Sequence, residues 1–269
     1  MTKRLATYLI LTTCVILLAG CQWRLKPNNM DPDEDPIMVE RYDRVESQYL
    51  TTGDFAALQQ MNLSYPMQTR TLLEDIINIG KVNEPDINSK FLNFYQDTTL
   101  QAIIREVEQQ YANMDDINSQ LEKSFSKLRE EMPGIHIPKF YAQIGSLDQS
   151  IIVGNNNVGI CLDKYLGKNY PIYLRYYSEQ QRELMVRNMI VPDCLVFYTL
   201  SICPIPDIQD QAGRDMHMGK IMWLANKMMG KRVFTTRYTK MVCHYMKSHK
   251  ETTVKQLLYG VTSQQITEG

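Results

Sequence analysis

Residue types that bind metals or nucleic acids are sparse in this chain. It contains four histidines among 269 residues, and 30 acidic residues balance its 29 basic ones, for a net charge of −1. A dedicated nucleic-acid binder carries a basic excess or stripe, so this balance argues against that class. Because few imidazoles are available to ligate a metal, we expect no cofactor. The hydrophobic fraction of 44% is that of an ordinary globular protein.

The motifs of several enzyme classes are also missing. A zinc hydrolase needs two histidines one helical turn apart around a glutamate. His244 and His249 are five residues apart, which turns them about 140° from each other on a helix, and His136 and His217 each stand alone. No Gly-Lys pair has the upstream glycine of a phosphate loop, and neither Gly-x-Ser-x-Gly nor Cys-x-x-Cys occurs. These absences predict a protein that is not an enzyme.

The N-terminus has the pattern of a bacterial lipoprotein signal. Lys3 and Arg4 precede the apolar run 5–18, and Leu18-Ala19-Gly20 stands directly before Cys21. The run of about 14 residues is shorter than the ~20 that a stable spanning helix needs. We predict that residues 1–20 are a cleaved signal peptide and that Cys21 is lipidated, with a thioether-linked diacylglycerol and an N-acyl chain such as palmitate. The alternatives are an uncleaved anchor and an ordinary signal peptide with a fortuitous cysteine.

Residues 21–36 have the composition of a flexible tether. They contain three prolines and a cluster of acidic residues but few apolar side chains, and the fifteen residues from Gln22 to Pro36 would span about 50 Å when extended. The signal peptide contains two of the 29 basic residues, Lys3 and Arg4, and none of the 30 acidic residues. The mature chain therefore keeps 27 basic and 30 acidic residues, for a net charge of −3. We expect a lipid-anchored protein of the cell envelope, in the outer membrane; whether it faces the periplasm or the surface stays open.

Residues 37–269 are predicted to form a single globular domain of the α+β class, mainly helical with a small antiparallel β-sheet. A change of periodicity separates helical from extended segments. Helices are expected over 66–79, from Thr98 or Thr99 to 111, over 115–132, from 179 to 200 with a kink or restart at Pro192, and over 216–229. The helix ending at 111 and the one starting at 115 should form an antiparallel pair. Short strands over 138–144, 150–153 and 158–162 suggest a hairpin or meander.

Four cysteines remain after Cys14 leaves with the signal and Cys21 is acylated. Cys194 and Cys203 are the candidate disulfide pair, because the end of a helix and a proline turn separate them. Buried free thiols are the alternative. The tyrosines over 170–177 either pack loops over the sheet, the reading we favour, or stack on a carbohydrate or a partner. The methionines of 216–229 follow the burial stripe of a helix and predict core packing.

Three segments together resemble one known family: Pro138-Lys139-Phe140, residues 158–167 (VGICLDKYLG) and residues 216–224 (MHMGKIMWL). They are similar to the gliding-motility lipoprotein GldB family of Bacteroidota, and the likeness covers about residues 41–239. The resemblance implies a zincin-like α+β fold without the metal motif, and a role in the cell envelope associated with gliding machinery. It carries over no catalytic residue. The lysine-rich part after Tyr238 departs from the family's pattern.

These observations support one leading functional hypothesis and one alternative. We expect an envelope-anchored lipoprotein that acts as a non-catalytic interaction or scaffold component. Its partners would be the membrane, through the lipid on Cys21, and other cell-envelope proteins, with no nucleic acid. The alternative is an envelope hydrolase or carbohydrate-binding lipoprotein, which would require a pocket with converging carboxylates of perturbed pKa.

Overall fold

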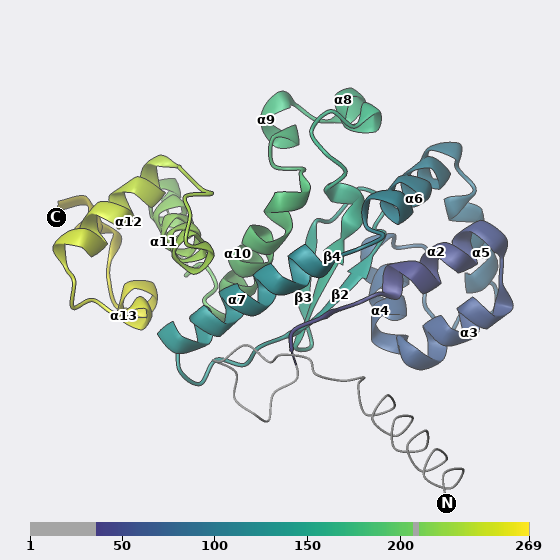
Figure 1. Ribbon diagram of the computed structural model, residues 1–269, viewed down its shortest axis with the longest axis horizontal. Coiled ribbons are helices and arrows are strands. Elements are labelled where there is room, and N and C mark those ends of the chain that lie inside the picture. Colours follow the sequence, from purple (N-terminus) through teal and green to yellow (C-terminus); the bar gives the residue numbers. More distant parts are fainter. Residues whose placement is uncertain (1–35, 207–209, 269) are drawn as a thin grey trace, which may run out of the picture. The chain divides into compact units, whose positions relative to one another are not determined.

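Helices flank a small four-stranded sheet (Figure 1). The computed structural model describes residues 36–206 and 210–268, and the segment Ile37–Gly269 clusters as one unit. Most of the described residues are helical, so the predicted α+β class with predominant helices is confirmed. The predicted signal peptide, Cys21 and the tether up to residue 35 lie outside the described residues.

The sheet combines parallel and antiparallel pairs. Across the sheet the strands are β1 (Val39–Glu40), β2 (Lys139–Gln143), β4 (Asn157–Cys161) and β3 (Ile151–Gly154). β2 runs parallel to both β1 and β4, whereas β3 runs antiparallel to β4. The prediction of an antiparallel sheet is therefore right for the β3–β4 hairpin and wrong for the pairs that β2 makes.

The hairpin explains this topology. The chain leaving β2 crosses to the far position of β3 and then turns back, so that β4 fills the place between them and runs in the same direction as β2. The turn consists of Asn155 and Asn156, with φ values of 51° and 60°. Two left-handed residues suit the twist of a tight hairpin, and asparagine tolerates that conformation better than most residues.

Most of the helices before the sheet pack around α2. The elements are α2 (Tyr42–Thr52), α3 (Phe55–Ser64), α4 (Pro66–Thr71), the π-helical turn η1 (Leu72–Ile76), α5 (Ile87–Tyr95) and α6 (Thr98–Gln110). The helix predicted from Pro66 exists as α4 continued by η1. α6 begins where predicted, but its cap is Asp97, whose carboxylate accepts hydrogen bonds from the amides of Thr99 (2.8 Å) and Leu100 (3.1 Å).

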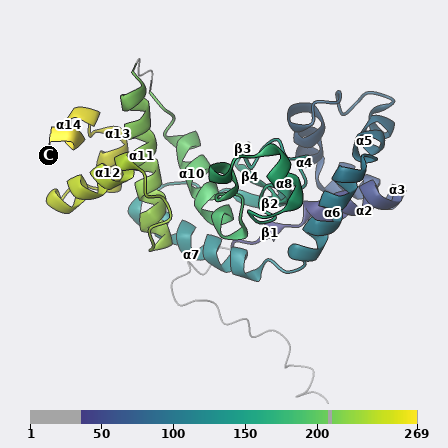
Figure 2. The same ribbon diagram turned by 90° about the horizontal axis from the view of Figure 1, so that it is seen from above.

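The long helix α7 (Asp115–Glu131), predicted over 115–132, crosses the domain with an apolar stripe buried. Phe125 of this stripe packs edge-on against Phe140 of β2, with ring centroids 4.9 Å apart. The predicted antiparallel pairing with α6 is wrong. α6 packs against α2 and the turn η2 (Leu162–Lys164), whereas α7 packs against α10 (Ile190–Ile202) and α11 (Gln211–Met229) (Figure 2). The apolar faces of α6 and α7 are therefore buried against different elements.

The remaining short elements connect β4 to α10. They are α8 (Pro171–Tyr176), α9 (Glu179–Arg182) and the 3₁₀ turn η3 (Arg187–Met189). Pro192 lies in the first turn of α10, so the interruption predicted there is a helix restart.

The C-terminal helices build a second, smaller apolar cluster on α11. They are α12 (Arg237–Ser248), α13 (Val254–Tyr259) and α14 (Ser263–Glu268). The buried members of the cluster are Met216, Val242, Tyr245, Leu257 and Ile266. The methionines of α11 pack in the core as predicted, because Met216 and Met228 are buried. The stripe predicted through Met218, Met222 and Met229 is wrong, since these three side chains are half-buried at the margin of the main core.

Candidate functional site

Strand β3 forms one edge of the sheet. Its single strand neighbour among the described residues is β4. The amide of Cys161 donates to the carbonyl of Ser150 at 3.0 Å, which makes Ser150 and Cys161 a hydrogen-bonded pair. Because such pairs alternate along an antiparallel ladder, the N–H and C=O groups of Ile151 and Val153 face away from β4. No other strand of the described residues pairs with these outward groups, although α10 packs against β3 and the side chain of Ile151 is buried.

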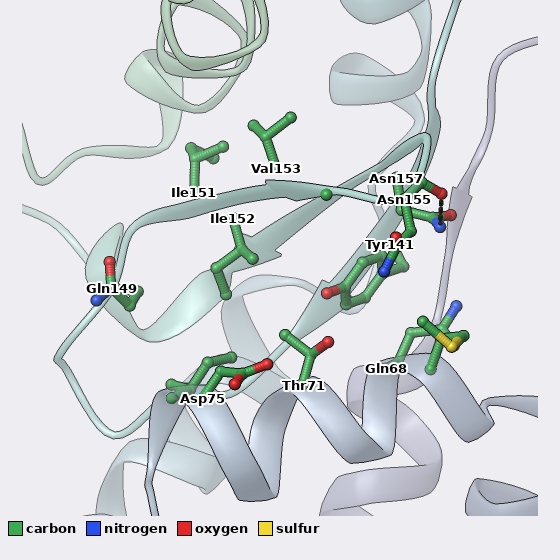
Figure 3. A pocket seen from close by; sticks show the side chains of 13 residues that line it. Gln68, Thr71, Asp75, Tyr141, Gln149, Ile151, Ile152, Val153, Asn155 and Asn157 are labelled. Carbon is green, nitrogen blue, oxygen red and sulfur yellow. Dashed lines mark hydrogen bonds between the residues drawn. The ribbon is translucent and has the colours of Figure 1, made fainter. Parts of the chain in front are cut away.

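A groove of about 400 Å³ lies beside this edge, between the sheet and the helical segment formed by α4 and η1 (Figure 3). Ile152 of β3 and Tyr141 of β2 face the helical segment, which contributes Thr71 and Asp75. Gln149 lines the groove where the chain enters β3. We call this cavity, with these lining residues, the β3 groove. Its wall mixes polar groups with aliphatic and aromatic carbon.

A glycine on the neighbouring strand positions Tyr141. Gly159 of β4 is the register partner of Tyr141, and a Cβ on Gly159 would lie 2.5 Å from both Cζ and the hydroxyl oxygen of that tyrosine. The ring therefore lies over the strand in space that a side chain would otherwise fill. Tyr141 also meets the ring of Tyr42 edge-on, with centroids 6.5 Å apart. Burial raises the pKa of Tyr141, so the groove presents a neutral hydroxyl.

Two buried carboxylates hold the loop that leads into β3. Glu46 of α2 accepts a hydrogen bond from the amide of Ile144 at 2.9 Å. Asp163 accepts from the amides of Gly145 (2.7 Å) and Leu147 (2.5 Å). Burial raises the pKa of both carboxyl groups, while these amides act against that rise. The contacts fix a turn in which Leu147 has a φ of 67°, so both carboxyl groups have a structural role at the groove.

Another buried acid, Asp193, lies in the first turn of α10. The hydroxyl of Tyr165 donates a hydrogen bond to its Oδ2 at 2.8 Å. Burial raises the pKa of Asp193 to about 7, and the hydrogen bond from Tyr165 opposes this rise. Asp193 does not line the β3 groove.

The carboxylates with raised pKa do not converge in the β3 groove. Glu46, Asp163 and Asp193 are absent from its wall, and Asp75 is the single carboxylate there. Hydrolysis by paired carboxylates needs two such groups on either side of one substrate bond. Within residues 36–206 and 210–268, no group of three or more His, Cys, Asp or Glu side chains could hold a metal ion. The groove therefore has the groups to bind a ligand, but it lacks a catalytic pair.

The histidines are dispersed, as their spacing predicted. His217 is buried in α11, with Nε2 2.9 Å from the carbonyl oxygen of Cys203, and burial lowers its pKa. His249 caps α12 and stacks on Tyr245 with ring centroids 4.1 Å apart. His244 lies exposed on α12, and His136 lies in the loop before β2.

The predicted disulfide between Cys194 and Cys203 is wrong. Both side chains are buried free thiols, which was the alternative reading. Cys194 lies near the start of α10 and Cys203 caps its end. Nine residues of helix separate their Cα atoms by about 13 Å, whereas a disulfide requires less than about 7 Å. Cys161 and Cys243 are free thiols as well.

The tyrosine-rich segment packs over the turn after β4, which confirms the favoured reading. Tyr173 is fully buried; its hydroxyl donates to the carbonyl of Asp163 and accepts from the amide of Leu166 at 3.0 Å. The rings of Tyr170 and Tyr177 meet Tyr173 edge-on.

Sequence reasoning missed the β3 groove. The strand itself was predicted, as part of a hairpin or meander. No local signal shows that β3 lies at an edge, because its edge position follows from the pairing of β2 with β4 instead of β3, and periodicity does not identify a pairing partner. Thr71 and Asp75 likewise sit on a predicted helix whose contact with the sheet is a tertiary feature.

The fold and the groove define an α+β domain with an open binding surface beside a sheet edge. The family described as gliding motility protein GldB matches residues 25–240, most of the chain. The chain therefore belongs to the GldB lipoprotein family and is a gliding-motility-related lipoprotein of the cell envelope. The match ends within α12, close to Tyr238, where the sequence was expected to depart from the family.

Neither a curated protein nor a solved structure matches the chain. The zincin-like character of the fold stays a prediction. Among the helices of the described residues, none combines the length and the apolar character needed to span a bilayer.

Proposed function

We propose that the protein is a lipid-anchored, non-catalytic interaction component of the cell envelope, which binds an extended segment of another envelope protein along β3. Residues 1–20 act as the signal peptide, Cys21 carries the lipid, and residues 21–36 tether the single domain 37–269 to the outer membrane. Membership of the GldB lipoprotein family and the small residues before Cys21 support the anchor.

The free edge of β3 is the observation that carries the binding proposal. An extended peptide placed beside β3 would pair with the outward N–H and C=O groups of Ile151 and Val153. Alternate side chains of that peptide would enter the β3 groove, where Tyr141 and Ile152 offer apolar contact and Thr71 and Gln149 offer hydrogen bonds. Backbone pairing would supply affinity, and the groove would supply sequence preference.

The hydrolase alternative receives less support. It needs converging carboxylates, and the β3 groove has Asp75 alone. The carbohydrate alternative depended on the tyrosines over 170–177, of which Tyr173 is fully buried.

Photocrosslinking in cells tests strand addition. Benzoylphenylalanine in place of the exposed Gln149 should give discrete crosslinked products with envelope proteins. Val153→Pro should remove these products, because proline deletes an outward N–H without breaking the β3–β4 ladder. Val153→Ala keeps the N–H and should retain them.

Two further measurements keep this test decisive. The thermal unfolding midpoint of Val153→Pro should stay close to that of the parent chain, which separates a lost partner from a lost fold. The same photocrosslinker in place of the exposed Arg105, on α6, should not give the Gln149 products. Products from Gln149 that persist in a folded Val153→Pro chain would overturn the strand-addition mechanism.

A further inference from the structure

A second cavity lies between α11 and α12 in a strongly basic part of the chain. Residues 227–250 contain no acidic residue, although the whole chain is net acidic, and their basic residues are Lys227, Lys231, Arg232, Arg237, Lys240, Lys247 and Lys250. The cavity has a volume of about 610 Å³ and is lined by α11, α12 and the loop that joins them. We call it the α11–α12 pocket.

Basic side chains form two sides of this pocket. Lys240, His244 and Lys247 follow one another at spacings of four and three residues on α12, which places them on one face of the helix. Lys231 and Arg232 come from the joining loop.

Most of this charge is not neutralised by the protein. Lys227 pairs with Glu131 of α7 at 2.6 Å. Across residues 36–206 and 210–268, no acidic side chain lies within ion-pair distance of Lys231, Arg232, Lys240 or Lys247, and no acidic residue lines the pocket.

The rest of the wall is mainly apolar and firmly built. Trp223 of α11 and Phe234 of the loop line the pocket. Asn226 ties the loop to α11: its Oδ1 accepts from the amides of Val233 (2.8 Å) and Phe234 (2.9 Å), and its Nδ2 donates to the carbonyl of Phe234 at 2.8 Å. α12 then begins with a cap from Thr236. These contacts hold the aromatic wall and the basic rim in place.

We propose that the α11–α12 pocket binds the phosphate headgroup of an anionic membrane lipid. The phosphate would pair with the basic rim, and the apolar part of the lipid would lie over Trp223 and Phe234. An acidic peptide matches this wall poorly, because it would bury several carboxylates against apolar carbon. The location of the protein beside a membrane rests on the proposed lipid anchor, whereas the chemistry of the pocket does not.

Fluorescence quenching of Trp223 tests the proposal. The chain has two tryptophans, Trp23 and Trp223, so Trp23→Phe leaves Trp223 as the single reporter. The full chain in this background is reconstituted into phosphatidylcholine vesicles that contain an equal fraction of brominated phosphatidylglycerol or of brominated phosphatidylcholine. We expect the anionic brominated lipid to quench Trp223 about twofold more strongly than the zwitterionic one.

Charge variants identify the pocket as the cause. The double variant Lys231→Gln, Lys247→Gln should lower the ratio of quenching by the anionic lipid to quenching by the zwitterionic lipid to about 1. Each basic residue raises the affinity for an anionic surface several-fold, so the loss of two should remove the preference. Arg105→Gln with Arg175→Gln removes two exposed cations on α6 and α8 and should leave the ratio unchanged. Excess inorganic phosphate should leave it unchanged too, if the lipid is the ligand.

Three results would overturn the proposal: equal quenching by the two brominated lipids, a ratio that survives in the pocket double variant, or loss of the ratio on adding a polyglutamate peptide. Flotation with pure phosphatidylcholine vesicles reports the lipid anchor separately. If the chain lacks the anchor, it should still float with anionic vesicles when the pocket binds them. The two proposals can therefore fail independently.

Discussion

The buried carboxyl groups of Glu46, Asp163 and Asp193 have different tasks, although burial raises the pKa of all three. Glu46 and Asp163 accept backbone hydrogen bonds and fix the loop before β3. Asp193 accepts a hydrogen bond from the hydroxyl of Tyr165 and no backbone contact is described for it. Since the pKa of Asp193 rises to about 7, its charge should affect stability near neutral pH.

Asp193→Asn should raise the thermal unfolding midpoint at pH 8 and leave it nearly unchanged at pH 4. An unfolded aspartate has a pKa of about 4, so the native state holds the proton up to a higher pH. The neutral carboxyl therefore stabilises the native state fully below the unfolded pKa of about 4. This stabilisation is lost as the pH rises through 7, which lowers the free energy of unfolding by roughly 2–4 kcal/mol. Thermal melts of both chains at several pH values measure this.

Exposed Asp148 provides the control for this experiment, because Asp148→Asn should show no pH-dependent difference from the parent chain. A midpoint for Asp193→Asn that follows the parent at every pH would contradict the role of Asp193.

At the scale of elements, pairs of strands and helices create both cavities. The parallel pairing of β2 with β4 sets Tyr141 against Gly159, and the antiparallel hairpin leaves β3 at an edge. The pocket in the basic region depends on the contact of α11 with α12 and on the short loop between them.

Gly159→Ala should destabilise the sheet by about 1–3 kcal/mol and displace Tyr141. The new Cβ would lie 2.5 Å from the tyrosine ring, which must move away into the β3 groove. Urea unfolding measures the loss of stability, and crosslinking from Gln149 should weaken as the groove changes. Gly154→Ala on the same hairpin has no atom within 4 Å of its Cβ and should be nearly neutral. Equal stability of the two variants would contradict this packing argument.

At the scale of the whole molecule, charge is unevenly distributed. The mature chain is expected to be net acidic, with an acidic cluster in the tether, whereas residues 227–250 are basic throughout. Five of the seven basic residues in 227–250 lie within the family match, which ends at residue 240, and Lys247 and Lys250 lie beyond it. A tethered domain with a basic pocket could hold a preferred orientation at an anionic membrane.

Cys21→Ser should abolish fatty-acid labelling and leave an unprocessed precursor that keeps residues 1–20. The thiol of Cys21 is the proposed acceptor of the lipid, and a hydroxyl does not replace it. Cys14→Ser, within the signal peptide, should be labelled and processed like the parent chain. Metabolic labelling and intact mass measure both effects, and density fractionation tests the outer membrane. Continued labelling of Cys21→Ser would refute the anchor.

Local sequence was sufficient for features that depend on neighbours along the chain. The apolar stripe of α7 and the β3–β4 hairpin follow from periodicity and turn chemistry over short segments. Each of the three segments that carry the family resemblance is a short continuous stretch of the sequence. The family match confirms the resemblance. The dispersed histidines also agreed with their spacing.

Tertiary contacts decided everything that joins distant segments. The parallel pairing of β2, the divergence of α6 and α7, and the edge position of β3 depend on which buried stripe meets which partner, and periodicity does not identify a partner. The disulfide prediction failed because sequence proximity is not spatial proximity when α10 stays helical up to Cys203. The β3 groove arises in the same way, from residues 67–76 and 141–157, which are far apart in the chain and share a wall in the folded domain. The α11–α12 pocket is instead lined by the single stretch 223–247 and depends on how α11 and α12 pack across their joining loop.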